Sequence, residues 1–465
     1  MKLEITMKKQ IFLGGTVMKN KLIFTVLILK LITYQFCFSF DFNLKQIYQI
    51  PENYDESKKY RTYVADETMK KILKDKTLDE LRTKNTNTYV KNVCDIIQQK
   101  AQNDFEKVKM AHDFIALLIT YDTANFLAGT VPPQDYVTVL KSKTAVCEGY
   151  SNVFLKFCQT LKIPCRKIHG YARGVGTSIA QKENPEVSNH AWNMVKIKNA
   201  WYFIDNTWDS GFIAGRTSLN SYSTEYLFPE PEKFIYTHYP EIKAEQLLEN
   251  SISKEEFLQL PNFRPRFFET AEFENQIPKT ISTDNNLTLS FKELNNYELS
   301  FSLTNAKETQ RYFNRVFKTS ESNNTKVMFS LPEKGLFIVN IFFKKHGEKK
   351  SWLCGRFLIE AKSENKSVFP EIYETKYKTS IISPTESPLI RNKTYNFSVL
   401  SEDKGNSIVI ICGKEIVQLE KNEETHLFTG EFTIPENAGN VSIGIAGSSK
   451  ARSYEILAKY ETTRE

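Results

Sequence analysis

The sequence of 465 residues lacks the features that define several classes of small, metal-bound or nucleic-acid-binding protein. It has seven cysteines and no Cys-x-x-Cys pair, which argues against a structural zinc site. So few cysteines in so long a chain also exclude a disulfide-rich scaffold. No strong charge excess is present: 62 basic and 55 acidic residues give a net charge of +7, spread along the chain. We therefore expect no nucleic acid among its partners.

The sequence also lacks an uninterrupted apolar run near its start. The segment from Met18, MKNKLIFTVLILKLITYQFCFSF, is apolar, but Lys30 interrupts it, so we expect no stable membrane span. Its basic start and the small residues Cys37 and Ser39 at its end are typical of a signal peptide. We therefore expect residues 1–39 to be a targeting segment and the protein to be secreted or extracytoplasmic. The alternative is an apolar helix that the mature protein keeps.

The hydropathy pattern of the first half indicates helices followed by a small sheet. The segment DFEKVKMAHDFIALLITYD has helical periodicity behind the capping candidate Asn103, with His112 as a core or boundary residue. Strand-like runs follow at 165–173, 190–197 and 201–207. Helices giving way to an antiparallel sheet indicate an α+β domain.

Beyond about residue 265, alternating apolar and polar residues indicate strands. Two pairs of segments there resemble each other at offsets of about a hundred residues, the size of one β-sandwich. LPEKGLFIVNIF (331–342) resembles IPENAGNVSIGI (434–445), and LSFSL (299–303) resembles YNFSV (395–399). The second half is therefore predicted to hold two β-sandwiches.

The stretch TAVCEGYSNVFLKFC raises the question of whether Cys147 is packing or a reactive thiol. Apolar residues recur at three- and four-residue steps behind it, as in an amphipathic helix that starts near Cys147. Most cysteines at such positions are inert core residues. Cys158 and Cys165, further along, could form a disulfide in an exported protein, and two reduced core thiols fit equally well. A base with its orienting carboxylate would favour a nucleophile at Cys147.

The segment NHAWNMVKIKNAWYFIDNTW holds both a histidine and an aspartate, and its pattern is that of a β-hairpin with a two-residue turn at Lys198–Asn199. The paired positions are then Ile197–Ala200, Trp192–Asp205 and His190–Thr207. His190 and Asp205 would therefore project from one face of the sheet, within reach of a hydrogen bond.

Cysteine, histidine and aspartate together carry a defined chemistry. A thiol attacks a carbonyl as thiolate, and an adjacent imidazole accepts its proton. A carboxylate fixes the tautomer of that imidazole. A helix start at Cys147 would favour the thiolate and supply N–H groups for an oxyanion, whereas the charge of Glu148 would oppose a second anion nearby.

The segments AVCEGYSNVF, NHAWNMVKI and WYFIDNTWDSG together resemble a transglutaminase-like domain of the kyphoscoliosis peptidase family. The resemblance continues through YLFPEPEKFIYTHYPE and EQLLENSISKEEFLQLP into the β region, over roughly residues 105 to 460. It implies that Cys147 is the nucleophile, His190 the general base and Asp205 the orienting carboxylate. Gln134, thirteen positions before Cys147, is too distant in sequence to be assigned as a papain-type oxyanion glutamine.

The resemblance also implies the fold class: α+β, with a transglutaminase-like (papain-like) catalytic domain followed by two immunoglobulin-like β-sandwiches. No calcium-ligand cluster of the kind animal transglutaminases need is seen, and we expect no cofactor and no metal. The predicted domain ranges are a targeting segment at 1–39, a helical lead-in at 40–104, the catalytic domain at 105–264, and β-sandwiches at 265–364 and 365–465.

Three functions compete on this evidence. The first is a cysteine peptidase that hydrolyses peptide or amide bonds through a thioester. The second is a transglutaminase that passes the acyl group of glutamine to an amine. The third is a catalytically silent scaffold that binds protein partners through its β-sandwiches. Both enzymes would act on a protein or peptide substrate, and the triad serves both equally.

Overall fold

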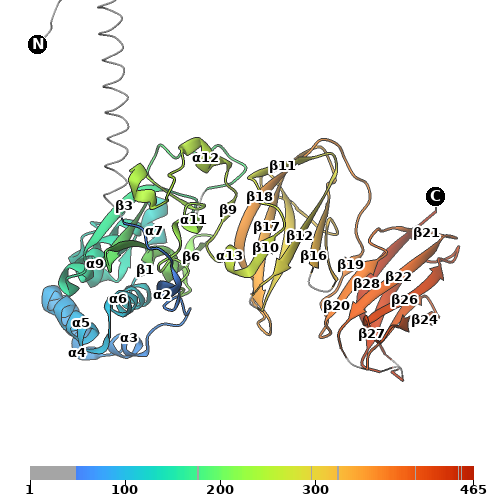
Figure 1. Cartoon of the computed structure of the whole chain (residues 1–465), viewed down its shortest axis with the longest axis horizontal. Helices are drawn as coiled ribbons and strands as arrows, with labels where there is room; N and C mark the ends of the chain where they lie inside the picture. Colours follow the sequence, from blue (N-terminus) through green and yellow to red (C-terminus); the bar gives the residue numbers. More distant parts are fainter. Residues whose placement is uncertain are drawn as a thin grey trace, which may run out of the picture.

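The structure, a computed structural model, describes residues 49–464 apart from 175–176, 295, 322–323, 404, 449 and 452. These residues form an α+β domain and two β-sandwiches arranged in a row (Figure 1), which confirms the predicted fold class. The predicted targeting segment lies outside the described residues. Within the described part of the chain, no helix is long and apolar enough to cross a membrane.

The first domain opens with a layer of helices. In order, these are α2 (Asp55–Lys58), α3 (Glu67–Ile72), α4 (Lys76–Lys84), α5 (Thr86–Lys100) and α6 (Asp104–Leu118). As predicted, Asn103 caps α6, since its side chain accepts a hydrogen bond from the Glu106 amide. His112 on α6 is fully buried. Two short strands and two short helices follow: β1 (Thr120–Tyr121), α7 (Thr123–Ala128), α8 (Tyr136–Ser142) and β2 (Thr144–Ala145).

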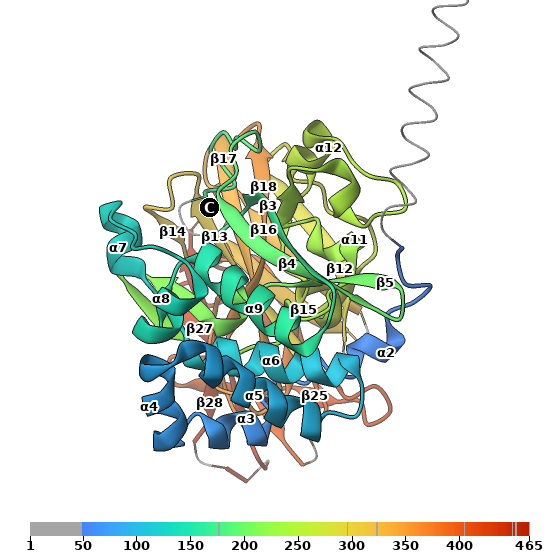
Figure 2. The same cartoon turned by 90° about the vertical axis from the view of Figure 1, so that its left-hand side faces the viewer.

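Helix α9 (Cys147–Leu161) forms the centre of this domain. It contacts α5 and α6 on one side and strand β4 (His190–Ile197) on the other (Figure 2). Its predicted apolar stripe is fully confirmed, because every member is at most 3% exposed: Tyr150, Val153, Phe154, Phe157, Cys158 and Leu161. Residues of α5 and α6 share this core, so the helical lead-in expected at 40–104 packs into the same body as the domain expected at 105–264.

The sheet of this domain is antiparallel, with the order β5-β4-β3-β8. Its other strands are β3 (Cys165–Ala172), β5 (Ala200–Ile204) and β8 (His238–Pro240). The predicted hairpin register is confirmed from Ile197–Ala200 as far as Asn193–Ile204. The two further pairs predicted, Trp192–Asp205 and His190–Thr207, do not form, because β5 ends before them. The turn residues Lys198 and Asn199 both have positive φ angles, 49° and 69°, as a two-residue turn that matches strand twist requires.

The strand predicted at 201–207 is too long. Strand β5 ends at Ile204, and residues 206–210 form helix α10 (Asn206–Ser210). The reason is local: the Asp205 carboxylate accepts hydrogen bonds from the amides of Thr207 and Trp208 and so caps a helix. Asp205 therefore approaches His190 from a helix N-cap and not from a continued strand.

Because the hairpin register sets the position of Asp205, we expect one extra glycine between Lys198 and Asn199 to uncouple Asp205 from His190. Turnover of a p-nitrophenyl ester should fall roughly tenfold or more, with a much smaller relative effect on the melting temperature. A matched control is one glycine inserted in the equally tight turn after Gly413, where Cys412 pairs with Glu415. Unchanged turnover in the Lys198 variant would show that the register does not position the site.

Several short elements lead from the sheet to the first sandwich. They are the hairpin β6 (Gly211–Ala214) and β7 (Thr217–Asn220), helix α11 (Pro231–Phe234), the 3-10 turn η1 (Lys243–Gln246), helix α12 (Lys254–Gln259), strand β9 (Asn262–Phe263) and helix α13 (Phe267–Thr270). Strand β9 pairs with β18 (Trp352–Ala361) of the first sandwich. The α+β domain is therefore joined to that sandwich by a strand pair.

The first sandwich packs two sheets around one apolar core. One sheet has the order β10-β12-β16-β15, and the other has the order β11-β18-β17-β13-β14. The bounds not yet given are β10 (Ala271–Phe273), β11 (Thr280–Thr283), β12 (Asn286–Glu293), β13 (Tyr297–Asn305), β14 (Arg311–Tyr312), β15 (Val316–Glu321), β16 (Asn324–Ser330) and β17 (Gly335–Lys345).

The second sandwich repeats this arrangement with the sheets β20-β22-β26-β25 and β19-β28-β27-β23-β24. Its strands are β19 (Glu371–Ile372), β20 (Thr379–Ser383), β21 (Leu389–Ile390), β22 (Thr394–Ser401), β23 (Ser407–Cys412), β24 (Glu415–Gln418), β25 (Glu420–Lys421), β26 (Leu427–Thr433), β27 (Asn440–Ala446) and β28 (Glu455–Thr463).

Of the two pairs of similar segments found in the sequence, only one corresponds to equivalent strands in the two sandwiches. The 331–342 and 434–445 segments overlap β17 and β27, which occupy equivalent places in the two sandwiches. The 299–303 and 395–399 segments lie on β13 and β22, and these are not equivalent, because β22 pairs with β26 as β12 pairs with β16. That second resemblance reflects only the alternation common to many strands.

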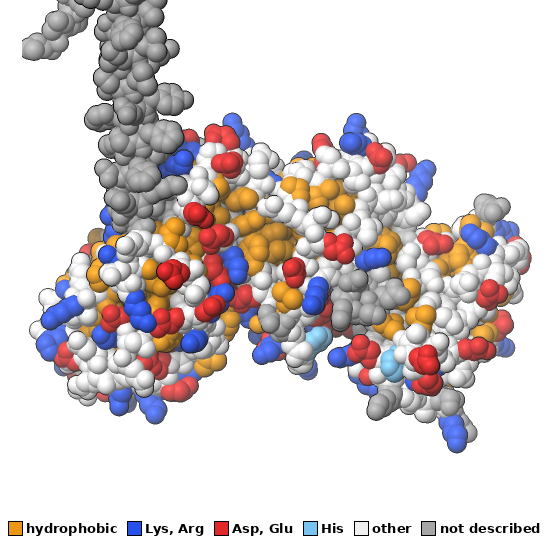
Figure 3. Space-filling model, viewed as in Figure 1, with side chains coloured by type: hydrophobic (Ala, Val, Ile, Leu, Met, Phe, Trp, Pro, Cys, Tyr) orange, Lys and Arg blue, Asp and Glu red, His pale blue; other side chains and the backbone are white. Residues whose placement is uncertain are grey.

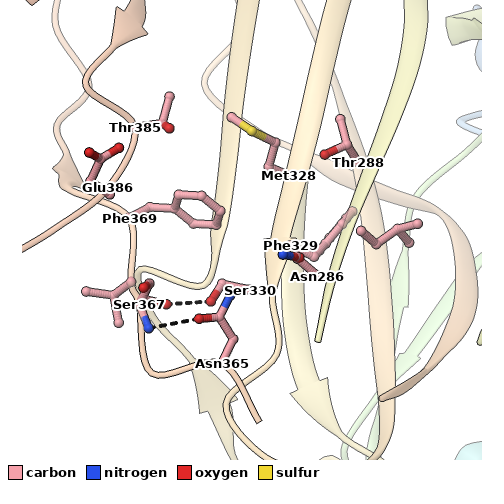
Figure 4. A pocket seen from close by; sticks show the side chains of 12 residues that line it. Asn286, Thr288, Met328, Phe329, Ser330, Asn365, Ser367, Phe369, Thr385 and Glu386 are labelled. Carbon is pink, nitrogen blue, oxygen red and sulfur yellow. Dashed lines mark hydrogen bonds between the residues drawn. The ribbon is translucent and has the colours of Figure 1, made fainter. Parts of the chain in front are cut away.

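The two sandwiches meet across a small junction. Phe317 of the first packs into the core of the second, and its ring lies 5.5 Å from that of Phe369. A cavity of about 180 Å³ lies beside this contact (Figure 4), where the Ser330 hydroxyl donates to the Ser367 carbonyl. The residues that line the cavity all belong to the β region, so it is separate from Cys147 and His190.

Candidate active site

Cys147 is the first residue of α9, and Val146 is the N-cap. Its backbone N–H therefore has no acceptor within the helix and is available to an anion. The chain is closely packed at this point: a Cβ at Gly149 would collide with Gln134 Oε1 and would lie 2.8 Å from the Ala145 Cβ. Glycine in the Cys-Glu-Gly segment therefore allows the start of α9 to sit against the preceding loop.

His190 opens β4 and lies between the thiol and the carboxylate. Its imidazole lowers the pKa of the Cys147 thiol by hydrogen bonding and charge, and its Nε2 lies 2.7 Å from Asp205 Oδ2. The ring is buried and packs near the indoles of Trp192 and Trp208, with centroids 5.9 Å and 5.7 Å away. The structure thus brings together the three residues selected from the sequence.

Asp205 uses both carboxylate oxygens. Oδ1 accepts from the Thr207 and Trp208 amides at 2.8 Å and 3.2 Å, and Oδ2 accepts from His190. The carboxylate is buried, and it is held at the end of β5 by the start of α10. One side chain therefore caps a helix and orients the imidazole.

His238, on β8, is a residue of this site that sequence analysis missed. Its Nε2 lies 3.2 Å from the same Asp205 Oδ2, and its Nδ1 lies 2.8 Å from the Thr237 hydroxyl. Burial lowers the pKa of His238 to about 4, so it is neutral near pH 7. A neutral ring facing a carboxylate through Nε2 must carry its proton there, which makes Nδ1 the acceptor for Thr237. The segment FIYTHYPE was noted in the sequence, but its histidine lies 33 positions from Asp205.

The electrostatics favour a thiolate and imidazolium pair. Burial raises the pKa of the Cys147 thiol, but the hydrogen bond and charge of His190, with a hydrogen bond from the Ala191 backbone, outweigh burial and lower it. Burial lowers the pKa of His190, yet Asp205 and Cys147 raise it overall to about 10. Burial likewise opposes ionisation of Asp205, and His190 and His238 hold its pKa well below the usual range.

A buried polar network anchors α10. His112 Nε2 lies 3.1 Å from Asp209 Oδ2, its Nδ1 lies 3.1 Å from Asp113 Oδ1, and its carbonyl accepts from the Asn206 side chain. The Ser210 hydroxyl donates to the Tyr150 hydroxyl at 3.0 Å, which ties α10 to α9. His112 thus acts at a distance from the thiol, by fixing the helix that Asp205 caps.

Two further residues near the start of α9 have roles that the sequence did not reveal. The Glu148 carboxylate pairs with the Lys167 ammonium and with His169 Nε2 at 3.1 Å, so its charge is balanced close to Cys147. Gln134 lies beside the helix start despite its sequence distance, because its Oε1 accepts from the Val146 amide at 2.9 Å. Its Nε2 donates to the Pro132 carbonyl, so both the oxygen and the nitrogen of its side-chain amide have hydrogen-bond partners.

The same site contains a donor set that could hold a metal ion. The ligand atoms of His190, Asp205 and His238 lie within 4.8 Å of one another, and two imidazoles with a carboxylate suit zinc. Metal binding requires unprotonated ring nitrogens, whereas both Nε2 atoms here face Asp205 Oδ2. With the pKa of His190 raised to about 10, the geometry fits a hydrogen-bonded ion pair better than a metal centre.

Comparison with known proteins defines the class. Residues 91–206 match the family model of the transglutaminase-like superfamily, and residues 254–371 match that of the KY-like, immunoglobulin-like domain. The first domain is therefore transglutaminase-like, and a KY-like immunoglobulin-like domain follows it. This order of domains confirms the resemblance to the kyphoscoliosis peptidase family.

The similar proteins align over part of their length. Kyphoscoliosis peptidase of Homo sapiens is 30% identical over 167 residues, 36% of this chain and 25% of that protein. Hillarin of Drosophila melanogaster is 26% identical over 191 residues, 37% of this chain and 23% of that protein. The aligned part thus spans about a quarter of these curated relatives. A solved transglutaminase structure, titled "Crystal structure of a TGase", is 22% identical with a TM-score of 0.22, covering 32% of this chain and 36% of that one.

Proposed function

We propose that this chain is a cysteine acyl-transfer enzyme that cleaves amide bonds in a protein or peptide substrate and passes the acyl group to water. One observation carries the proposal: Cys147 stands at the start of α9 under the influence of His190, and His190 is hydrogen-bonded to Asp205. The lowered pKa of Cys147 and the raised pKa of His190 fit a nucleophile and its base. The peptidase named among the relatives is in accord with this chemistry.

The reaction follows from the geometry. The Cys147 thiolate adds to the substrate carbonyl, and the N–H groups at the start of α9 stabilise the oxyanion. The His190 imidazolium gives its proton to the departing amine, which leaves a thioester on Cys147. His190 then takes a proton from water as that water attacks the thioester. The carboxylic acid product leaves, the Cys147 thiolate and the His190 imidazolium are restored, and Asp205 holds the imidazole in orientation throughout.

The same residues would serve a transglutaminase, in which a primary amine replaces water as the acceptor. A glutamine donor then releases ammonia, and an isopeptide bond forms. The two β-sandwiches support the third function, because immunoglobulin-like domains commonly bind proteins. In that case the first domain would be a scaffold with no turnover.

These functions are distinguished by one assay on the full chain. Casein and a biotinylated primary amine are incubated with the wild type and with Cys147→Ala, and fragments and biotin incorporation are measured by mass spectrometry. Cleavage that needs Cys147 supports the hydrolase. Biotin incorporation that needs Cys147, without cleavage, supports the transglutaminase. A thiol-directed acyl probe serves as reference, and absence of all Cys147-dependent labelling would support the scaffold.

We also propose that the segment starting at Met18 directs export. Its basic start, apolar run and small residues support this proposal. Edman sequencing of protein recovered from the medium should give a first residue near Phe40. A first residue well before Phe40 would contradict cleavage at this segment.

A further inference from the structure

A cavity of about 810 Å³ lies between the transglutaminase-like domain and the first β-sandwich. His190 and Trp208 line it from the first domain, and Trp352 and Arg356 of β18 line it from the sandwich. Its volume is in the upper part of the range for ligand sites, roughly 300–1,000 Å³. The cavity therefore runs from the imidazole of the proposed catalytic site to the surface of a different domain.

One wall of this cleft is apolar and spans both domains. The hairpin β6–β7 extends from α10, and its Phe212 and Leu219 are 40% and 48% exposed. The Phe212 ring meets the Trp352 indole edge-on, with centroids 6.0 Å apart and an interplanar angle of 80°. An aromatic pair is thus built from a catalytic-domain hairpin and a sandwich strand.

The sandwich is fixed in place at the cleft by polar contacts. The Arg264 amide donates to the Cys354 carbonyl at 2.9 Å, and Lys279 pairs with buried Glu183 at 2.7 Å. Glu308 pairs with Arg356 at 3.3 Å and accepts from the Ser178 hydroxyl at 3.3 Å. Figure 3 shows hydrophobic side chains gathered where the two bodies meet. The position of Trp352 relative to His190 is therefore set by several independent contacts.

We propose that this cleft binds an extended segment of the acyl-donor polypeptide, with a large aromatic or apolar side chain seated against Phe212 and Trp352. The proposal rests on the proposed function, because it takes Cys147 and His190 as the reacting groups. A reacting side chain alone needs far less space than the cleft offers. Exposed aromatic rings that line a cavity are typical anchors for a binding partner. The first β-sandwich is then a part of the substrate site.

The test compares reagents that attack the same thiol. Benzyloxycarbonyl-Phe-Ala chloromethyl ketone and its Gly-Gly counterpart both lose chloride to the Cys147 thiolate and form a thioether, and iodoacetamide loses iodide in the same way without any peptide. In the full-length wild type, the Phe-Ala reagent should label Cys147 about tenfold faster than the Gly-Gly reagent.

Trp352→Ala should bring that ratio close to one. The iodoacetamide rate of the same variant, measured without any peptide, reports separately whether Cys147 is still reactive. Trp352→Phe should keep most of the preference. Phe313→Ala is the matched control, because Phe313 belongs to the same sandwich, is 73% exposed and does not line the cleft.

The test distinguishes failure of the cleft proposal from failure of the proposed function. If iodoacetamide labels Cys147 but the wild type shows no preference, or if Trp352→Ala retains the preference, the cleft proposal is wrong and the proposed function stands. If none of the reagents labels Cys147 in the native protein, the proposed function is wrong, and the cleft proposal falls with it.

Discussion

Asp205→Asn is expected to reduce turnover of a p-nitrophenyl ester roughly a thousandfold or more while Cys147 remains accessible to iodoacetamide. The carboxylate accepts four hydrogen bonds, two at Oδ1 from backbone amides and two at Oδ2 from His190 and His238. Asparagine has one oxygen. If that oxygen caps α10, the asparagine NH₂ group faces His190 Nε2 and His238 Nε2, both of which donate a hydrogen bond in the wild type. The NH₂ group cannot accept from them, so His190 loses the tautomer that points a lone pair at the thiol.

The matched control is Asp122→Asn, which alters another helix-capping aspartate, that of α7. It should change turnover by less than about twofold, because Asn caps helices as well as Asp does. Circular dichroism melts of both variants separate loss of orientation from unfolding. Near-normal turnover in a folded Asp205→Asn protein would contradict the assigned role of this carboxylate.

His190→Ala is expected to shift the pH profile of Cys147 alkylation towards alkaline pH. In the wild type, the lowered pKa keeps the thiol ionised below its usual range, and alkylation declines only as pH falls through that lowered value. Without the imidazolium, burial is left as the largest influence on the thiol, and burial raises its pKa. Because the thiolate fraction at a fixed acidic pH falls tenfold for each pH unit by which the pKa of the thiol rises, the rate at pH 6 should fall roughly a hundredfold.

The control for this profile is His169→Ala. His169 contacts Glu148 near the start of α9, but its side chain is 46% exposed, and it is not one of the three residues Cys147, His190 and Asp205. Its profile should overlay that of the wild type. A His190→Ala profile that also overlays the wild type would mean that the imidazole does not ionise the thiol.

The fold was predictable wherever local patterns act alone. The stripe behind Cys147 defined α9, and the turn at Lys198–Asn199 defined the register of β4 and β5, because side-chain periodicity and turn geometry are short-range properties. The same reasoning extended β5 too far, because Asp205 is at once a strand-end residue and a helix cap. Its contact with His190 was predicted correctly, although the backbone that makes it was not.

The rest of the site depends on long-range packing. His238 reaches Asp205 through the pairing of β8 with β3, and no residue near Asp205 in sequence indicates that pairing. Gln134 reaches the start of α9 because α8 and β2 fold the intervening segment back on itself. Trp352 meets Phe212 across two domains. Each of these contacts needs the tertiary fold, which single-sequence periodicity does not contain.

Native alkylation at pH 6 shows directly whether Cys147 is a nucleophile or a packing residue. The full chain is treated with iodoacetamide before and after denaturation, and the labelled peptides are mapped. Burial raises the pKa of the Cys94 thiol to about 12 and that of Cys158 well above its usual value, so these thiols should react only after denaturation. We predict that native label falls on Cys147. Label on Cys158 or Cys165 with none on Cys147 would contradict a catalytic thiol at that position.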